Sequence, residues 1–166
     1  MAECHGPHAR HCVFSLPPEG ADPAWDGPAP ELTVLVVDDE PDVRWVLEMI
    51  LRRNGFAVAM AGSGDEALRW LRETERACHL ILLDAKLGDI EGVELARRIR
   101  TETSCIAPVI LVSGYFYKDD SLVQLSLRTG LIAGFVTKPF RHEDILNAIN
   151  IVLSTGSGTI TMAPSP

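Results

Sequence analysis

The residues of this chain best suited to chemistry each follow a short apolar run. They are Asp38 and Asp39 after residues 32–37, Asp84 at the end of residues 79–84, Ser113 at the end of residues 108–113, and Lys138 after residues 133–137. Apolar runs of this length are typical of strands buried in a parallel sheet. The carboxyl ends of parallel strands lie at one edge of the sheet, where ligands bind. We therefore expect these five side chains to meet in one pocket.

The chemistry of such a pocket follows from its charges. Clustered carboxylates repel one another and stay ionised only when a cation lies among them. Asp38, Asp39 and Asp84 offer only oxygen ligands, and a site with few protein ligands beside water and phosphate oxygens favours Mg²⁺. Such an ion would neutralise an incoming phosphoryl group and leave Asp84 free to attack it and form an acyl phosphate. Lys138 and the Ser113 hydroxyl are suited to binding phosphoryl oxygens.

Amphipathic segments separate the apolar runs and supply the elements that position these residues. We expect strands at residues 32–37, 56–61, 79–84, 108–113 and 133–137, and helices at about residues 41–53, 63–71, 91–101, 119–130 and 142–153. Pro41 suits the first position of a helix, Ser63 to Glu66 forms a capping box, and either Asp119 or Asp120 can cap the fourth helix. Strands that alternate with helices predict a parallel α/β sheet with helices on both faces.

Composition limits the classes of function. The chain has 166 residues, a net charge of −8 and a pI near 5.0, which disfavours nonspecific binding to nucleic acid or to an anionic membrane. No apolar run approaches the roughly 20 residues that span a bilayer, and the amino terminus lacks the apolar stretch of a signal peptide. We therefore expect no membrane association and a cytoplasmic protein. The four cysteines form no CxxC motif, and a reducing compartment would keep them as thiols.

The two ends of the chain lack a core-forming pattern. We interpret residues 1–30 as a flexible, proline-rich leader, residues 31–154 as one folded domain, and residues 155–166 as a disordered tail. The leader contains five residues able to bind a soft metal, and we hypothesise a second site for zinc, copper or nickel: Cys4, His5, His8, His11 and Cys12. The alternative is a tail that merely contains His and Cys, because their spacing matches no closed structural site.

The whole folded segment, about residues 31–154, resembles the receiver domain of two-component response regulators. The resemblance rests on the motifs Val36–Glu40, Leu83–Asp84 with Gly92, Val112–Gly114 and Thr137–Phe140. It implies a flavodoxin-like, CheY-like (βα)5 doubly wound sheet with strand order 2-1-3-4-5. It also implies that Asp84 is the phosphoacceptor, that Asp39 binds Mg²⁺ directly, and that Asp38 acts largely through water. The Lys86 backbone carbonyl is implied as a further ligand.

The same resemblance implies the moving parts of a switch. Ser113 would be the hydroxyl switch residue, Phe135 the aromatic switch and Lys138 the phosphate-binding lysine, with a cis Lys138–Pro139 bond. Phosphorylation would then draw in Ser113, shift the fourth helix and bury Phe135.

The resemblance also implies a function. We expect a single-domain response regulator that takes a phosphoryl group from a phosphohistidine of a histidine kinase or phosphotransfer protein. It would catalyse only its own phosphorylation and hydrolysis, so it would not otherwise be an enzyme. Nothing after residue 154 resembles a DNA-binding domain. We therefore expect output through a downstream protein target, with a homodimer through the fourth and fifth helices as one possibility.

The sequence departs from the family pattern at three points. Gly88 stands where proline is usual, which should loosen the loop after Asp84. Lys86 is a long cation beside the pocket, where its side chain can contact the phosphoryl group or hinder attacking water. Between Gly130 and Phe135 the chain has one residue more than usual, which leaves the register of the fourth helix open.

Three other functions compete with this interpretation. A haloacid-dehalogenase-like phosphatase also uses an Asp nucleophile with Mg²⁺, but it places Asp-x-Asp after its first strand, where this chain has adjacent Asp38 and Asp39. A flavodoxin-like FMN binder needs a phosphate-cradling loop there, which these carboxylates would oppose. The strongest rival is a receiver fold that works as a binding module, with phosphorylation incidental.

Overall fold

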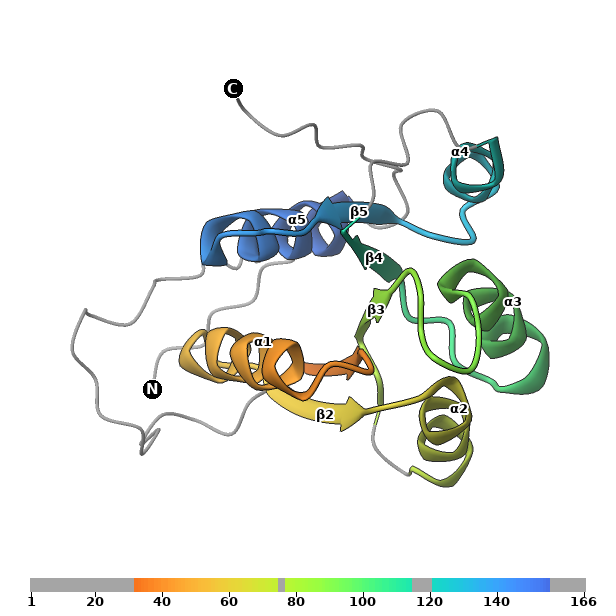
Figure 1. Cartoon of the computed structure of the whole chain (residues 1–166), viewed down its shortest axis with the longest axis horizontal. Helices are drawn as coiled ribbons and strands as arrows, with labels where there is room; N and C mark the ends of the chain where they lie inside the picture. The colour runs from red at the N-terminus through yellow and green to blue at the C-terminus, as the bar shows by residue number, and fades with distance from the viewer. Residues whose placement is uncertain (1–31, 75–76, 115–120, 156–166) are drawn as a thin grey trace, which may run out of the picture.

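The computed structural model describes residues 32–74, 77–114 and 121–155, in which five strands alternate with five helices (Figure 1). The elements are β1 Thr33–Val37, α1 Pro41–Arg53, β2 Ala57–Ala61, α2 Gly64–Glu73, β3 Leu80–Asp84, α3 Gly92–Glu102, β4 Val109–Ser113, α4 Ser121–Arg128, β5 Gly134–Thr137 and α5 His142–Thr155. The expected leader with its His and Cys cluster, most of the expected tail and the expected cap at Asp119 or Asp120 lie outside the described residues.

The five strands form one parallel sheet in the order β2-β1-β3-β4-β5, which confirms the predicted fold class. In this register Val37 pairs with Leu83, Asp84 pairs with Val112, and Ser113 pairs with Thr137. The last residues of β1, β3, β4 and β5 are therefore neighbours at one edge of the sheet, as expected from the sequence.

The helices form two layers around the sheet. In Figure 1, α1 and α5 cover one face and α2, α3 and α4 cover the other. Successive strand residues point to opposite faces, so that Val34 and Leu82 pack in the cluster on the α1/α5 side while Leu35 and Leu83 pack in the cluster on the other side. Both faces of the central strands are dry, which is why their sequences are continuously apolar.

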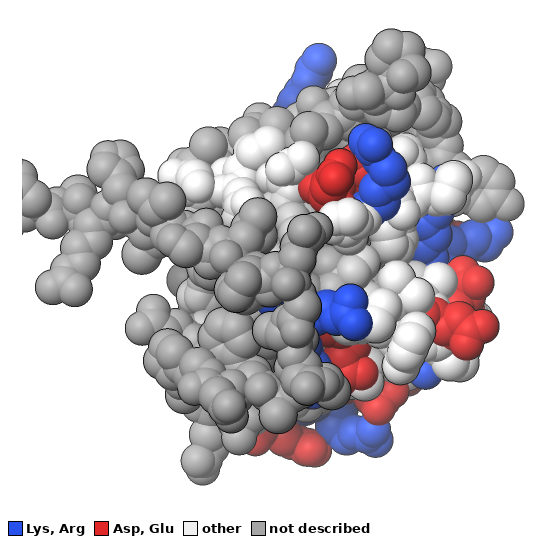
Figure 2. All heavy atoms as spheres, turned by 90° about the vertical axis from the view of Figure 1, so that its left-hand side faces the viewer, with Lys and Arg blue, Asp and Glu red and all other residues white. Residues whose placement is uncertain are grey.

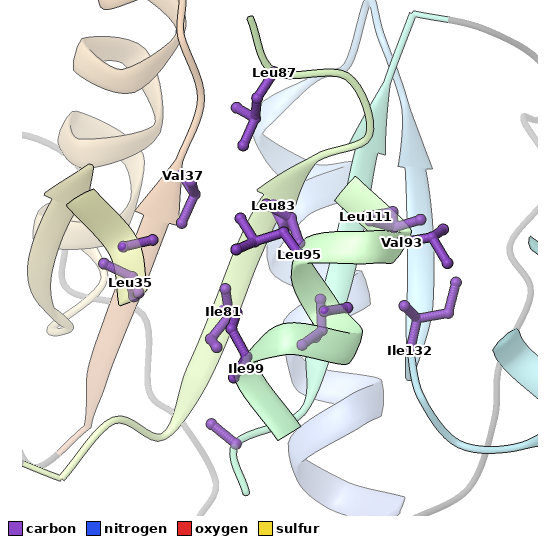
Figure 3. Packing of buried hydrophobic residues seen from close by; sticks show 14 of the residues in the cluster. Leu35, Val37, Ile81, Leu83, Leu87, Val93, Leu95, Ile99, Leu111 and Ile132 are labelled. Carbon is purple, nitrogen blue, oxygen red and sulfur yellow. The ribbon is translucent and has the colours of Figure 1, made fainter. Parts of the chain in front are cut away.

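The core between the sheet and α3 holds β3 in place. Figure 3 shows Ile81 and Leu83 of β3 next to Leu95 and Ile99 of α3, and all four side chains are fully buried. Fully burying one Leu or Ile side chain stabilises the fold by roughly 1.5–3 kcal/mol. The strand that ends in Asp84 is thus fixed by packing on both faces.

Helix ends follow the expected rules with one difference. Pro41 opens α1, which ends at Arg53 and is followed by the C-cap Asn54 and by Gly55 in a left-handed conformation with φ of 80°. Ser63 accepts a hydrogen bond from the backbone N–H of Glu66, as in a capping box. The carboxylate of Glu66, however, accepts from the N–H of Gly62 at 2.7 Å rather than from that of Ser63. The reciprocal half of the box is shifted by one residue.

The described residues visible on one face carry mixed charge. Figure 2 views the side on which α1 and α5 lie, and the acidic and basic side chains that can be seen there are interspersed with neutral ones. None of the helices in the described ranges is long and apolar enough to cross a membrane.

Candidate functional site

Three carboxylates meet at the edge of the sheet. Asp38 and Asp39 directly follow β1, and Asp84 is the last residue of β3, the strand next to β1. One oxygen from each carboxylate lies within 4.8 Å of the others. Asp38 and Asp84 are buried, with 1% and 7% of their surface exposed, whereas Asp39 is exposed. Two of the three carboxylates are therefore shielded from water, whereas the third is open to it.

Lys138 reaches into this cluster from the loop after β5. Its peptide bond to Pro139 is cis, as expected, and its backbone N–H donates to the Ser113 carbonyl at 2.6 Å. Its Nζ lies 2.8 Å from Asp38 Oδ2, 3.1 Å from Asp84 Oδ2 and 3.4 Å from Glu40 Oε1. One ammonium group thus bridges the two buried carboxylates.

The electrostatics of the cluster follow from burial and from this bridge. Burial raises the pKa of Asp38, although hydrogen bonds from Lys138 and from the Glu40 backbone N–H act in the opposite direction. Burial also disfavours the charged form of Lys138, but its bonds to Asp38 and Asp84 outweigh that effect and raise its pKa. With one ammonium against three clustered carboxylates, the local excess of negative charge favours a cation. The oxygen-only donor set fits a hard divalent ion such as Mg²⁺.

Both oxygens of Asp84 are oriented. Oδ1 accepts a hydrogen bond from the backbone N–H of Lys86 at 3.1 Å, and Oδ2 faces Lys138. The residues after Asp84 form a short turn in which Leu87 N–H donates to the Ile90 carbonyl at 3.1 Å. The Lys86 side chain is exposed beside this turn. The carboxylate is therefore presented in one orientation before any substrate arrives.

Gly92 lets α3 begin directly against the end of β3. Its N–H donates to the Ala85 carbonyl at 2.8 Å, and a Cβ at this position would lie 2.4 Å from the Asp84 carbonyl oxygen and 2.8 Å from the Ala85 Cα. Both are backbone atoms that cannot move aside easily. Gly88, by contrast, would place a Cβ at an ordinary 3.6 Å from the Asp39 carboxylate, so a side chain fits there.

We expect Gly92→Ala to lower the free energy of unfolding by about 2 kcal/mol, because the added methyl group would be forced against backbone atoms. This cost outweighs the higher helix propensity of Ala, which is worth roughly 1 kcal/mol relative to Gly. Urea unfolding of the wild type and the variant measures this. The matched control is Gly114→Ala, because no atom of the residues that the structure describes lies within 4 Å of a Cβ at Gly114. Equal stability of the two variants would contradict the close approach at Gly92.

Ser113 and Phe135 occupy the positions expected of them, while their roles stay predictions. Ser113 is buried at the end of β4, one residue beyond the Asp84–Val112 pair. Phe135 is buried on β5 within the same core cluster as Val123 of α4. The expected burial of Phe135 on phosphorylation has no counterpart in this structure, because the ring is already inside. If Phe135 acts as a switch, its movement would be transmitted to α4 through this shared cluster.

Sequence reasoning missed two contributors. Glu40 faces Lys138, although its place before Pro41 indicated only the start of a helix. Asp89 ties the loop after β3 to α2, because its carboxylate accepts hydrogen bonds from the backbone N–H of Gly64 at 2.9 Å and of Asp65 at 3.3 Å. In the sequence, Asp89 lies shortly before the start of α3, where an acidic residue is common. Only the fold shows that its carboxylate binds the start of α2 instead.

Comparison with known proteins agrees with this geometry. The model of the response regulator receiver domain family matches residues 34–150. The chain is 32% identical over 133 residues to the probable transcriptional regulatory protein TcrX of Mycobacterium tuberculosis, covering 78% of this chain and 53% of that protein. It is 35% identical over 133 residues to the transcriptional regulatory protein AfsQ1 of Streptomyces coelicolor, covering 80% and 56%. The chain spans about half the length of these relatives.

Solved structures show the same fold. A CheY-like response regulator receiver domain protein from Methanospirillum hungatei superposes with a TM-score of 0.65 at 27% identity, covering 75% of this chain and 94% of that one. Response regulator TrrA from Thermotoga maritima, in complex with Mg²⁺ and BeF, has a TM-score of 0.61 at 28% identity, covering 73% and 98%. This chain therefore belongs to the response regulator receiver domain family, the phosphoacceptor signalling domains of two-component systems.

Proposed function

We propose that this receiver accepts a phosphoryl group on Asp84 from a phosphohistidine of a histidine kinase or phosphotransfer protein, in a reaction that depends on Mg²⁺. The observation that carries the proposal is the Lys138 ammonium between the Asp38 and Asp84 carboxylates, with an oxygen of Asp39 within 4.8 Å of theirs. A nucleophile, a cation for the phosphoryl oxygens and a set of metal ligands thus share one small volume.

The carboxylates would bind the Mg²⁺ ion in different ways. Both oxygens of Asp38 accept hydrogen bonds from protein donors, Oδ1 from Glu40 N–H at 2.9 Å and Oδ2 from Lys138, which suits an indirect role through water. Asp39 is exposed and suits direct binding. Asp84 and the Lys86 backbone carbonyl would complete the protein ligands. Bound Mg²⁺ would neutralise charge on the phosphoryl oxygens.

In the transfer step an oxygen of the Asp84 carboxylate attacks phosphorus. The bond from phosphorus to the histidine nitrogen breaks, its electron pair returns to the imidazole, and a phosphorus–oxygen bond to Asp84 forms. Lys138 turns from Asp84 Oδ2 to a phosphoryl oxygen while it keeps its bond to Asp38. The Ser113 hydroxyl, at the end of the neighbouring strand, donates to another phosphoryl oxygen.

The acyl phosphate is read out by a protein partner. Movement of Ser113 toward the phosphoryl group would shift α4 and the surroundings of Phe135. Leu122 and Leu125 leave α4 with exposed apolar surface, with 49% and 56% of each residue accessible, which supports a protein target or a second copy docking at α4 and α5.

Lys86 should set how long the phosphoryl group lasts. Its side chain is exposed next to Asp84, and its charge and bulk lie where water must approach the acyl phosphate. We expect Lys86→Ala to change the lifetime of phospho-Asp84 at least about threefold. Following the decay of phosphorylated protein after removal of the donor measures this. Lys86→Gln separates charge from bulk, and an unchanged decay rate in both variants would refute the role.

Incubation with acetyl phosphate and Mg²⁺ distinguishes the candidate functions. Accumulation of one base-labile, hydroxylamine-sensitive phosphoryl group per chain is expected, and peptide mapping should place it at Asp84. Steady turnover of a small phosphoester without accumulation would instead indicate a phosphatase. If the protein is not labelled and does not turn over the phosphoester, the remaining candidate is a receiver fold that acts as a binding module. That result would overturn the proposal.

A further inference from the structure

Two cysteines lie at the edge of the sheet opposite Asp84. Cys78 precedes β3 and Cys105 precedes β4, and these two strands are paired neighbours. The register brings the two preceding loops together, because Ile81 pairs with Val109 and Ile81 N–H donates to the Pro108 carbonyl at 2.9 Å. Both cysteines are partly buried free thiols that pack against the core cluster on the α3 side.

The two cysteine side chains lie close to each other. Both pack against the same core cluster, and each lies near enough to the other to perturb its pKa. The Cys78 thiol donates a hydrogen bond to the Leu80 carbonyl oxygen at 3.5 Å. A disulfide needs Cα atoms about 4.4–6.8 Å apart, and neighbouring strands run about 4.8 Å apart. Cys78 lies three residues before Ile81 and Cys105 four residues before Val109, its paired partner, so the two cysteines begin from neighbouring positions.

The pair is also chemically unequal. The neighbouring Cys78 side chain lowers the pKa of Cys105 to about 6, with smaller contributions from the backbone N–H of Ala107 and the guanidinium of Arg100. That guanidinium is held in place by its bonds to the carbonyls of Cys105 at 3.0 Å and Ala107 at 2.7 Å. The interaction with Cys105 and burial raise the pKa of Cys78. One thiolate next to one thiol is the arrangement in which the first attacks an oxidant and the second resolves the product.

We propose that Cys78 and Cys105 form a peroxide-reactive dithiol that closes a reversible disulfide across the loops before β3 and β4. The Cys105 thiolate attacks one oxygen of a hydroperoxide, the O–O bond breaks, and the leaving oxygen takes up a proton to give an alcohol or water. The resulting Cys105 sulfenic acid is attacked by the Cys78 sulfur, which loses its proton as a second water leaves. The two cysteines are oxidised by two electrons and one peroxide is reduced.

The disulfide would link the chain at the amino-terminal ends of β3 and β4, whose carboxyl-terminal ends carry Asp84 and Ser113. It would close the chain segment from residue 78 to residue 105, which contains β3 and α3. Cross-linking a segment of this length restricts the unfolded chain, so that oxidation should raise the melting temperature by about 5 °C or more. The proposal is independent of phosphorylation, because it uses none of the residues near Asp84.

The experiment uses the full chain with Cys4→Ser and Cys12→Ser, which leaves Cys78 and Cys105 as its only thiols. The protein is treated with hydrogen peroxide, blocked with N-ethylmaleimide and mapped by peptide mass. We expect an intramolecular Cys78–Cys105 cross-link that dithiothreitol reverses, together with the higher melting temperature. Recovery of both residues as maleimide adducts, or a cross-link only between two copies, would overturn the proposal.

A matched variant tests the order of the two steps. Adding Cys78→Ser keeps a hydroxyl of similar size but removes the resolving sulfur. Peroxide should then leave Cys105 as a sulfenic acid that dimedone traps, with no cross-link and no rise in melting temperature. Failure of Cys105 to react with dimedone in this variant would contradict its assignment as the attacking thiolate.

Discussion

Replacing Lys138 with methionine should slow phosphorylation of Asp84 by at least about 100-fold, the loss seen when one preorganised donor to a developing charge is removed. Methionine keeps most of the volume of the side chain but removes the ammonium that lies 3.1 Å from Asp84 and 2.8 Å from Asp38. Without it, the two carboxylates lose their shared counter-charge, and the pKa of Asp38, already raised by burial, should rise further.

Phosphate-affinity electrophoresis during incubation with acetyl phosphate and Mg²⁺ measures this rate. Arg141→Met is the control, because Arg141 is a cation near Lys138 in the sequence whose side chain is 71% exposed and pairs with Glu143 and Asp144 instead. Circular dichroism should show that both variants are folded. A rate within threefold of wild type for Lys138→Met would contradict the role of the ammonium.

Asp39→Asn should have opposite effects on stability with and without Mg²⁺. Its oxygen lies within 4.8 Å of the other two carboxylates. Removing the charge without metal relieves a repulsion of about 1 kcal/mol and raises the free energy of unfolding. With Mg²⁺ at about 100 times its dissociation constant, the wild type should gain about 2.7 kcal/mol, and the variant should gain little of this because a direct ligand is lost.

Urea unfolding with MgCl₂ and with EDTA measures both effects. Asp42→Asn is the control, since Asp42 is an exposed acid in the first turn of α1 that does not belong to the cluster. It should respond to Mg²⁺ as the wild type does. If Mg²⁺ stabilised Asp39→Asn as strongly as the wild type, the carboxylates after β1 would not hold the ion.

The sequence was sufficient to predict the fold and the convergence of the site. The apolar runs of β1, β3 and β4 are buried on both faces, and their alternation with amphipathic helices indicates a parallel sheet between two helical layers. Once the strands are parallel, their carboxyl ends must share an edge. The proximity of Asp38, Asp84 and Lys138 follows from topology without any knowledge of side-chain conformation.

Contacts that depend on loop geometry were not predictable in this way. The reach of Glu40 to Lys138 depends on the turn after β1, and the bonds of Asp89 to α2 depend on the path of the loop after β3. The proximity of Cys78 and Cys105 depends on how far each loop extends before its strand begins. The hydrophobic periodicity of the sequence predicts helices and strands. The distances between these loop residues are set instead by the irregular segments that connect them.

The most direct test of the phosphoacceptor assignment is the intact mass of the chain after incubation with acetyl phosphate, with Mg²⁺ or with EDTA. Wild type should gain one phosphoryl group with Mg²⁺ and none with EDTA, and Asp84→Ala should gain none in either. Asp65→Asn serves as control, because the Asp65 side chain is 84% exposed in the first turn of α2 and pairs with Arg98, and this variant should still be labelled. A phosphoryl group that persists in Asp84→Ala, or that forms equally well in EDTA, would contradict the account.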